Sequence, residues 1–498
     1  MQHKIFTGSV ARQIDRLAID SFGYTGLSLM KKAGESAFSH IRSRVQTGQP
    51  KGLRMLVLCG GGNNGGDGYV VARCALLAGW RVTLIAYAAP SSRDAQAVAA
   101  EFSAAGGVAE TPADADTFDA CEVVVDALLG VGISGAPRGL YATAIEAANR
   151  LPAFKVAIDV PSGIDADSGF AHHPNFRADL TVTYIALKLG VLTGPATNSV
   201  GELVLEDLEL DRQVTDQVAE CANLLGKPTL PRRQSDSHKG KYGHVIITGG
   251  DNGMFGAVLL AGKAALRCGC GKVHILSTDA HLDKPSLYSP ELMSAVFENR
   301  PSELMQNAQA IVVGPGLGTN SWGREVFEHV VKTSTAPLVI DADALTLLAE
   351  SGYTAVGNKW VLTPHPGEAA RLLKCSVADI QSNRLDAVRQ IANQYHCLCV
   401  LKGAGTLIAD SHSEVSLCNL GNAGMATAGM GDVLSGMIAA FIGQGMALRP
   451  ATETAVWLHS YSADAWVKKH AAASLIASDI LDHLPTAMAM LAYDQACG

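Results

Sequence analysis

The sequence predicts an α/β protein made of two parallel-sheet domains in tandem. Three observations support this fold class. Short β-rich segments alternate with helical patterns over residues 55–186, the alternation stops in a polar, proline-containing stretch over residues 212–240, and the same alternation starts again at His244. At about 150 residues per domain, 498 residues fit two large domains. We therefore expect one domain over residues 1–220 and a second over residues 221–498.

Composition and charge exclude several classes of protein. Hydrophobic residues make up 48% and charged residues 17% of the chain, which supplies material for large cores and too little charge for disorder. A net charge of −8 argues against a whole-chain nucleic-acid binder, because phosphate contacts need clustered cations. The first twenty residues lack the apolar core of a signal peptide, and the apolar segment 434–446 is too short for a membrane span. We expect a cytoplasmic homo-oligomer that binds neither nucleic acid nor membranes.

The elements of the first domain follow in order. Apolar residues at helical spacing predict two helices over residues 9–45, with a break near Gly23, and we expect these helices to cap the sheet. The β-rich runs of a parallel sheet then begin at Met55, Arg81, Val123, Lys155 and Leu180.

In the second domain, β-rich runs begin at His244, Lys272, Ala310, Pro337, Trp360 and Cys397. The carboxyl ends of these runs are rich in Gly, Asp and His, and open α/β sheets bind their ligands at that edge. Cys268 and Cys270, like Cys397 and Cys399, form C-x-C pairs inside apolar runs. These spacings favour buried, reduced thiols over a zinc site or a disulfide.

A glycine-rich segment over residues 60–68 follows the first strand and leads into a helix expected from Tyr69. Glycines at a helix N-terminus let a phosphate approach the backbone. The second strand ends without the acidic residue of a dinucleotide fingerprint, and the segment lacks the Lys-Ser/Thr ending of a Walker A loop. Asn63, Asn64 and Asp67 are candidate ligands, and the alternative is a tight strand-to-helix turn.

Further polar side chains follow other strands of the first domain, namely Asp126, Asp159, Ser162 and Lys188. A parallel sheet brings such strand ends to one edge. Side-chain oxygens of Asn64, Asp126 and Ser162 suit a hard cation, and the turn over residues 130–136 offers N–H groups to a phosphate. Asp159 and Lys188 can move protons as an acid/base pair without a redox cofactor. For these two residues, a structural ion pair is the alternative.

The motifs GGGNNGGDGYVVAR, VDALLG, DVPSGIDADSG and ALKLGVLTGPA resemble the N-terminal domain of the bifunctional NAD(P)H-hydrate repair enzyme family, over nearly all of residues 1–220. The resemblance implies a Rossmann-like, three-layer domain that interconverts the R and S forms of NADHX and NADPHX, the hydrates of NADH and NADPH. It implies a bound potassium ion, held by Asn64, Asp126 and Ser162. It also implies that the hydrated nucleotide contacts Asn63, Asn64, Gly65, Gly66, Asp67, Gly130, Val131, Gly132, Ile133, Ser134, Gly135, Ala136 and Asp159. A catalytic role for Lys188 is inferred from its position and chemistry.

The second domain contains a glycine-rich turn over residues 421–431, and Asp432 follows it at the start of an apolar helix. A glycine-rich turn that aims N–H groups at a phosphate, beside a carboxylate that can take a hydroxyl proton, suits phosphoryl transfer. The alternative for Asp432 is a simple N-cap. His365 and Lys402 follow two further strands, and Asp341 and Asp343 face the same edge or cap the following helix.

The motifs SHKGKYGHVIITGG, VGPGLG, DADAL, LTPHPGEAARLL, VLKGAGT and NAGMATAGMGDVLSGMIAA resemble the C-terminal domain of the same family, over about residues 230–490. The resemblance implies a ribokinase-like α/β domain that dehydrates the S hydrate to NAD(P)H and converts ADP to AMP and phosphate, with magnesium expected but its ligands unassigned. ADP serves bacterial members of the family and ATP eukaryotic ones. The implied ADP contacts are Lys402, Gly403, Ala404, Gly405, Thr406 and Gly431. The implied contacts of the hydrated nucleotide are Ala257, Gly318, His365 and Asp432, with Asp432 as the base.

Two other functions are compatible with parts of this pattern. A ribokinase-type small-molecule kinase with a regulatory Rossmann-like domain would release a stable phosphorylated product instead of free phosphate. A first domain that only binds other molecules would be a scaffold, but Asn63, Asn64, Asp67, Asp126, Asp159 and Lys188 argue against that function, because a scaffold does not need them.

Overall fold

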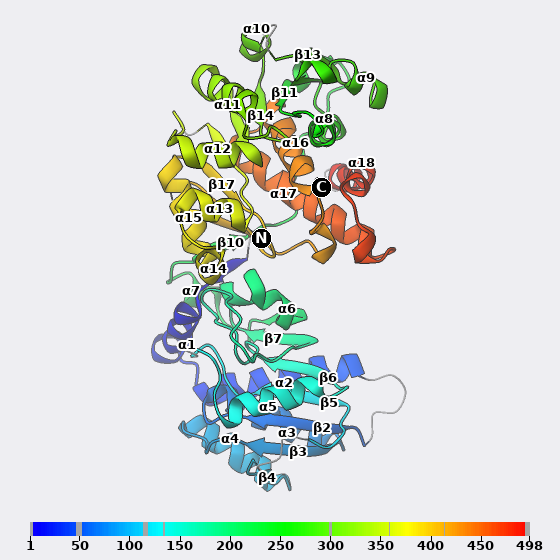
Figure 1. The fold of residues 1–498 in the computed structure, drawn as a ribbon. Helices are drawn as coiled ribbons and strands as arrows, with labels where there is room; N and C mark the ends of the chain where they lie inside the picture. The colour runs from blue at the N-terminus through cyan, green and yellow to red at the C-terminus, as the bar shows by residue number, and fades with distance from the viewer. Residues whose placement is uncertain are drawn as a thin grey trace. The chain divides into compact units, whose positions relative to one another are not determined.

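A computed structural model describes residues 3–45, 52–112, 118–132, 135–297, 301–357, 359–412 and 414–493. The chain divides into two compact units, the first over His3–Ala222 and the second from Asn223 onward (Figure 1). Each unit contains a sheet with helices on both faces, parallel in the first unit and mostly parallel in the second.

The described residues of the first unit form a parallel sheet in the order β4-β3-β2-β5-β6-β7-β9. Its strands are β2 (Arg54–Cys59), β3 (Arg81–Ala86), β4 (Ala109–Glu110), β5 (Val123–Ala127), β6 (Phe154–Ile158), β7 (Leu180–Tyr184) and β9 (Glu202–Glu206). Outside this seven-stranded sheet, β1 (Lys4–Phe6) pairs in parallel with β8 (Leu187–Lys188). From β4 to β7 this is the strand order of Rossmann folds. The order reverses between β2 and β5, so the carboxyl ends of these two strands border a ligand-binding crevice.

Helices cover both faces of this sheet, which confirms the Rossmann-like, three-layer prediction. They are α1 (Gly8–Phe22), α2 (Gly26–Val45), α3 (Asn63–Leu77), α4 (Arg93–Ala104), α5 (Leu140–Arg150), α6 (Thr197–Val200) and α7 (Arg212–Thr215). Alternate strand residues point to opposite faces, so Val57 and Val125 pack with α1 to α4, whereas Leu56 and Val124 pack with α5. The predicted break between the first two helices is confirmed, because Gly23 ends α1 with a φ of 75°.

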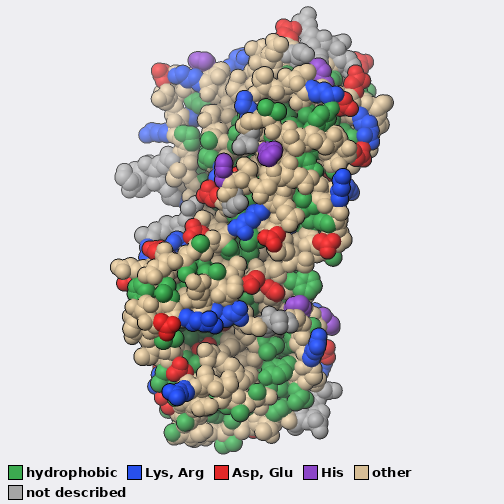
Figure 2. Space-filling model, turned by 90° about the vertical axis from the view of Figure 1, so that its left-hand side faces the viewer, with side chains coloured by type: hydrophobic (Ala, Val, Ile, Leu, Met, Phe, Trp, Pro, Cys, Tyr) green, Lys and Arg blue, Asp and Glu red, His purple; other side chains and the backbone are tan. Residues whose placement is uncertain are grey.

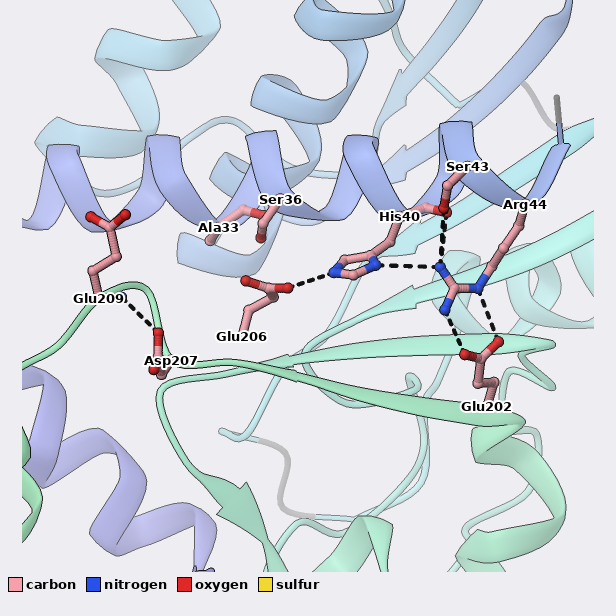
Figure 3. Close-up of polar contacts among 9 residues, drawn as sticks. All are labelled: Ala33, Ser36, His40, Ser43, Arg44, Glu202, Glu206, Asp207 and Glu209. Carbon is pink, nitrogen blue, oxygen red and sulfur yellow. Dashed lines mark hydrogen bonds and ion pairs between the residues drawn. The ribbon is translucent and has the colours of Figure 1, made fainter.

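Charged side chains tie α2 to the edge strand β9 (Figure 3). Arg44 donates to both carboxylate oxygens of Glu202, at 2.9 and 2.5 Å, and His40 lies 2.5 Å from Glu206. The Arg44 guanidinium also contacts the other ring nitrogen of His40 at 3.3 Å. These contacts fix the end of β9, and the chain that leaves β9 forms part of the site described below.

The second unit has a larger sheet, whose strands from β10 onward in the sequence follow the order β13-β12-β11-β14-β15-β16-β17-β18-β19-β10. Its strands are β10 (Ala222–Leu224), β11 (His244–Thr248), β12 (Lys272–Ser277), β13 (Met293–Val296), β14 (Ala310–Val313), β15 (Leu338–Ile340), β16 (Trp360–Leu362), β17 (Leu398–Leu401), β18 (Thr406–Ala409) and β19 (Val415–Cys418). The strands from β13 to β17 are parallel, and β18 is antiparallel to both of its neighbours. The strand order reverses between β11 and β14.

Figure 1 shows α8, α16, α17 and α18 on one side of this sheet and α11, α12, α13 and α15 on the other. The helices of the unit are α8 (Phe255–Arg267), α9 (Lys284–Tyr288), α10 (Pro301–Gln306), α11 (Ser321–Thr333), α12 (Asp343–Ser351), α13 (Pro366–Leu373), α14 (Val377–Ser382), α15 (Arg384–Tyr395), α16 (Met430–Gly443), α17 (Leu448–Val467) and α18 (Ala477–Tyr493). Twelve residues of α16 are buried, which makes it the central helix of the core.

The predicted burial of the paired cysteines is confirmed. Cys268, Cys270, Cys397 and Cys399 are buried free thiols, and burial raises the pKa of each of them. None of the described helices is long and apolar enough to cross a membrane. On the face shown in Figure 2, Lys and Arg side chains are interspersed with Asp and Glu.

Candidate active sites

A cavity of about 520 Å³ opens at the carboxyl ends of the first unit's strands. It lies where the order of this sheet reverses, as ligand sites of open α/β sheets do. Predicted site residues that line it are Asn63, Asn64, Asp67, Gly130, Val131, Gly132, Asp159 and Lys188. Residues of α1, α2 and the segment after β9 complete the walls, among them Arg12, Asp15, Met30 and Leu208.

The glycine-rich segment differs from the prediction. Helix α3 begins at Asn63 rather than Tyr69, so Gly65, Gly66 and Gly68 belong to its first two turns and are buried. A β-carbon on Gly68 would lie 2.6 Å from Cβ of Ala127 and 2.8 Å from Sγ of Cys59. These glycines therefore bring α3 close to the sheet, and the cavity receives Asn63, Asn64 and Asp67 from the start of the helix.

Asp159 and Lys188 form a nearly buried ion pair, with Nζ of Lys188 2.5 Å from Oδ1 of Asp159. Lys188 also donates to Oγ1 of Thr183 at 3.1 Å and to the carbonyl of Tyr184 at 2.7 Å, so all three ammonium hydrogens have acceptors. The Asp159 carboxylate accepts from Thr183 at 3.1 Å and from the Tyr184 amide at 3.3 Å. The pair lies on the cavity wall as the sequence predicts.

The backbone around the cavity is strained at three lining residues. Asp159, Ile185 and Leu208 have φ angles of 64°, 67° and 54°. Left-handed backbone costs about 1–3 kcal/mol for a residue other than glycine, and such residues cluster at functional sites. Leu208 follows β9 by two residues, and Figure 3 shows the charged side chains that link this strand to α2.

Asp126, Ser162 and Asn64 come together beside the cavity. The Asp126 carboxylate accepts from the amide and hydroxyl of Ser162, both at 2.7 Å, and from the amide of Leu128 at 3.2 Å. Burial raises the pKa of Asp126 to about 6. The Nδ2 of Asn64 donates to the carbonyl of Leu129 at 2.9 Å, and its Oδ1 is buried without a hydrogen-bond partner among the described residues. An unpaired buried oxygen next to other oxygens fits a cation ligand.

The turn predicted to bind a phosphate is described in part. Gly130, Val131 and Gly132 line the cavity, and the guanidinium of Arg12 donates to the carbonyl of Val131 at 3.2 Å. Ile133 and Ser134 lie outside the described residues, and Gly135 and Ala136 follow them without lining the cavity.

Two lining residues, Arg12 and Asp15, were missed by the sequence analysis. They lie three positions apart on α1, and residues at that spacing share one helix face. The pattern of α1 was interpreted only as amphipathic, with Ala11, Ile14 and Ala18 buried. The sequence signal that could have identified them is a basic and an acidic residue next to the buried face of α1.

The second unit gathers charged groups at the carboxyl ends of β15, β16 and β17. Nζ of Lys402 lies 2.8 Å from Oδ1 of Asp341 and 3.8 Å from Oε2 of Glu368. Burial opposes the charged form of Lys402, but the two carboxylates raise the pKa of its ammonium above the ordinary value. Burial also raises the pKa of Glu368 to about 7.

Asp432 lies in the first turn of α16, close to this cluster. Burial, followed by the charge of Asp341, raises the pKa of Asp432 to about 7, although Lys402 opposes the shift. The N-cap of α16 is Gly429, with a φ of 89°, so Asp432 is not the N-cap that was considered as an alternative. A β-carbon on Gly431 would lie 3.1 Å from Nζ of Lys402, which places the glycine-rich turn directly against the lysine.

His365 is the N-cap of α13. Its Nδ1 accepts from the amides of Gly367 at 3.0 Å and Glu368 at 3.3 Å, and Glu368 accepts in return from the His365 amide at 2.7 Å. A ring nitrogen that accepts two N–H groups carries no proton, so the proton of the neutral ring is on Nε2. Burial, together with the charge of Lys402, lowers the pKa of His365, which favours this neutral ring. The His365 side chain is half-exposed, and its Nε2 lies 3.4 Å from Oε1 of Glu368.

The other predicted residues of this site lie on neighbouring loops. The amide of Gly318 donates to Oδ2 of Asp343 at 2.8 Å, and the charge of Asp343 also acts on Asp432. Ala257 lies in the first turn of α8 and borders Gly316, which precedes Gly318 in the same glycine-rich loop. Asp341 and Asp343 thus bind Lys402 and Gly318, and neither side chain caps α12.

The loop over residues 402–406 rests on a residue that the sequence analysis missed, Arg384. Its side chain is fully buried and donates to the carbonyls of Leu401, Lys402 and Gly405, at 3.2, 3.3 and 3.4 Å. Within the loop, Thr406 donates to the carbonyl of Gly403 at 3.1 Å. A buried arginine that donates to three carbonyls fixes the shape of this loop. No short sequence motif indicates that Arg384 has this role.

Comparisons with known proteins match both units. Residues 245–486 match the family described as NAD(P)H-hydrate dehydratase, and residues 26–190 match the family described as YjeF-related protein N-terminus. The chain is 40% identical to the bifunctional NAD(P)H-hydrate repair enzyme of Coxiella burnetii, over 95% of this chain and 97% of that protein. It is 39% identical to the enzyme of the same name from Escherichia coli, over 97% of this chain and 93% of that protein.

A solved structure supports the fold of the second unit. A ribokinase-like superfamily protein from Enterococcus faecalis covers 55% of this chain and 98% of its own length, with a TM-score of 0.52 and 27% identity. This similarity confirms the ribokinase-like prediction. With both units matched, and with bifunctional relatives aligned over nearly the whole chain, the protein belongs to the family of bifunctional NAD(P)H-hydrate repair enzymes.

Proposed function

We propose that this protein repairs hydrated nicotinamide nucleotides in two steps. The first unit interconverts the R and S epimers of NADHX and NADPHX, and the second dehydrates the S form to NADH or NADPH with ADP as co-substrate. The observation that carries the proposal is the alignment of bifunctional repair enzymes over 95% and 97% of the chain. The two acid/base clusters support it, because each half of the reaction needs a group that moves protons.

In the first unit, Asp159 and Lys188 are the catalytic pair. Asn63, Asn64, Asp67, Gly130, Val131, Gly132 and Asp159 line the cavity that would hold the hydrated nicotinamide. Gly65 and Gly66 act by bringing α3 close to the sheet, and their backbone belongs to the N-terminal turn of a helix, where anions bind. By resemblance to the family, Ile133, Ser134, Gly135 and Ala136 would also contact the hydrated nucleotide.

A potassium ion fits beside this cavity. Asn64, Asp126 and Ser162 would hold it, and the unpaired Oδ1 of Asn64 supports that assignment. When bound, the ion would supply positive charge near the phosphates of the substrate. The neighbouring carbonyl of Leu129, which already accepts from Asn64, adds a further oxygen.

In the second unit, Asp432 is the base that takes the proton of the C6 hydroxyl. The freed oxygen attacks the terminal phosphorus of ADP, and the bond from that phosphorus to AMP breaks. Electrons of the ring nitrogen then expel phosphate from C6, and the C5 proton leaves to that phosphate as the C5–C6 double bond forms. The raised pKa of Asp432, about 7, suits a group that exchanges a proton near neutral pH.

The remaining residues of this site bind the two substrates. Lys402, Gly403, Ala404, Gly405, Thr406 and Gly431 would hold ADP, with Lys402 facing its phosphates. Ala257, Gly318, His365 and Asp432 would hold the hydrated nucleotide. Magnesium would neutralise phosphate charge when bound. Among the described residues, no three His, Cys, Asp or Glu side chains gather as a metal site, so its protein ligands stay unassigned.

The proposal also concerns the compartment, the binding partners and the oligomeric state of the protein. The free thiols of the described cysteines support a reducing compartment such as the cytoplasm. The net charge of −8, with mixed charges on the face that Figure 2 shows, supports small molecules rather than nucleic acid as partners. We also expect a homo-oligomer, and light scattering tests this by measuring the molar mass in solution.

The test is the return of reduced-nicotinamide absorbance from a mixed R and S hydrate preparation, with ADP, with ATP and without nucleotide. Wild type should convert the whole mixture with ADP. Asp432→Ala should convert none of it, and Asp159→Ala should convert the S form at the normal rate and leave the R form to its spontaneous epimerisation. A stable phosphorylated product in place of free phosphate would show a ribokinase-type kinase instead.

A further inference from the structure

Asp15 shares the cavity of the first unit with the acid/base pair but comes from a different element. It lies on α1, whereas Asp159 follows β6 and Lys188 ends β8. The charges of Lys188 and Asp159 both act on the Asp15 carboxyl, which shows that the three groups are close. Asp67, from α3, faces the same cavity and is affected by Asp15 and Asp159.

The fold does not use Asp15 as a structural ion pair. Lys188 already gives its three hydrogens to Asp159, Thr183 and Tyr184. The pKa of Asp15 is set by burial and by the charges of Lys188 and Asp159, and no described residue donates a hydrogen bond to its carboxyl. Burial, only partly offset by Lys188, raises the pKa of Asp15 to about 6. A half-buried carboxyl that opens into a cavity and stabilises nothing around it is typical of a functional group.

Inversion at a carbon atom needs proton transfer from two directions. If the hydroxyl leaves C6 from one face of the ring and water adds to the other, one group must protonate the leaving oxygen and another must deprotonate the incoming water. Asp159 and Lys188 form a single joined unit on one part of the wall. A second group from another element is therefore required, and two further cavity carboxyls lie on other elements, Asp67 on α3 and Asp15 on α1. Asp67 is already placed among the contacts of the hydrated nucleotide, so Asp15 is the carboxyl left for the second proton transfer.

We propose that Asp15 is a second catalytic residue of the epimerase, which exchanges a proton with the C6 oxygen on the face that Asp159 and Lys188 do not serve. This inference rests on the proposed function of the first unit.

The proposed step conserves every atom. Protonated Asp15 gives its proton to the C6 hydroxyl, the C6–O bond breaks, water leaves, and the lone pair of the ring nitrogen forms a C6–N double bond. Water then adds to the opposite face, and its extra proton goes to the Asp159 carboxylate. The substrate gains and loses one water, and the proton returns from Asp159 to Asp15 through solvent. The reverse epimerisation exchanges the roles of the two carboxyls.

The test uses the full chain with Asp15→Asn, and with Asp20→Asn as the matched control, since Asp20 is an exposed aspartate of the same helix. The rate of R to S inversion is measured on the pure R hydrate by a chiral separation, in water enriched in ¹⁸O. Dehydration of the pure S hydrate with ADP is measured on the same samples and reports an intact second unit.

We expect Asp15→Asn to slow inversion by about 10²–10⁴-fold, the usual contribution of a proton-transfer group, and Asp20→Asn to leave it unchanged. The calorimetric unfolding temperature should stay equal or rise, because the substitution removes a carboxyl from a crowded acidic site. In wild type, each inversion should place one solvent oxygen on C6.

Three results would overturn the inference: inversion by Asp15→Asn within threefold of wild type, loss of inversion together with a lowered unfolding temperature, or inversion in wild type without uptake of ¹⁸O. Failure of the wild-type protein to invert the R hydrate at all is a different result, because it contradicts the proposed function itself.

Discussion

Replacing Asp432 by asparagine should remove the dehydratase reaction and stabilise the second unit. The carboxyl lies among Asp341, Asp343 and Glu368, and burial and these charges raise its pKa to about 7. A carboxyl with a raised pKa resists ionisation in the folded protein. The folded state therefore loses stability as the pH rises from the carboxyl's ordinary pKa towards 7, and the cost is complete above pH 7.

The size of this effect follows from the two pKa values. A carboxyl with a pKa of 3.8 in the unfolded chain and about 7 in the folded protein costs up to about 4 kcal/mol above pH 7. Because the side chain is partly exposed, solvent screening lowers the cost, and we expect Asp432→Asn to gain about 2 kcal/mol near pH 8. Near pH 5 the gain should fall below about half of that value, because the carboxyl is then largely protonated in the folded protein.

Guanidinium denaturation of wild type and Asp432→Asn near pH 8 and pH 5 measures the gain. Four of the five tryptophans lie in the second unit, so their fluorescence follows its unfolding. A variant less stable than wild type near pH 8, or equally stabilised at both pH values, would refute this account of the Asp432 environment.

Three further predictions concern residues that position the sites. Arg384→Met removes the donor that holds the 402–406 loop, so the KM for ADP should rise at least tenfold in steady-state kinetics, while epimerisation stays normal; an unchanged KM would contradict this role. Gly68→Ala places a β-carbon 2.6 Å from Cβ of Ala127, and calorimetry should show the first unit destabilised by about 1–3 kcal/mol; no change would show that α3 can shift. Asn64→Ala removes the unpaired buried oxygen, and potassium should then no longer raise the epimerisation rate or the unfolding temperature, as it should in wild type; retained effects of potassium would place its site elsewhere.

Local sequence patterns were sufficient to predict the strands and the residues that follow them. Apolar residues at every second position, and continuous apolar runs, predicted the main strands. Parallel pairing of these strands brings Asp159 to Lys188 and Lys402 to Asp341. The start of α3 could not be predicted in the same way, because glycine has low helix propensity and the close packing against Ala127 that makes glycine necessary depends on tertiary structure.

Residues that act through long-range contacts were not predictable from the motifs. Arg384 is seventeen or more positions from the carbonyls it binds, and its place at the start of α15 suggests an ordinary surface arginine. Asp15 belongs to a helix that precedes the sheet and reaches the cavity only through the packing of α1. Three residues of the cavity wall also adopt left-handed backbone, which side-chain patterns do not reveal.

The central claim is that one chain carries out both repair steps, and the pure R hydrate tests it most directly. Wild-type protein with ADP should restore the full reduced-nicotinamide absorbance from this epimer, faster than spontaneous epimerisation allows, and release one phosphate for each nucleotide restored. Absorbance that returns only at the spontaneous rate would contradict an active first unit, and no return from either epimer would contradict the repair function of the chain.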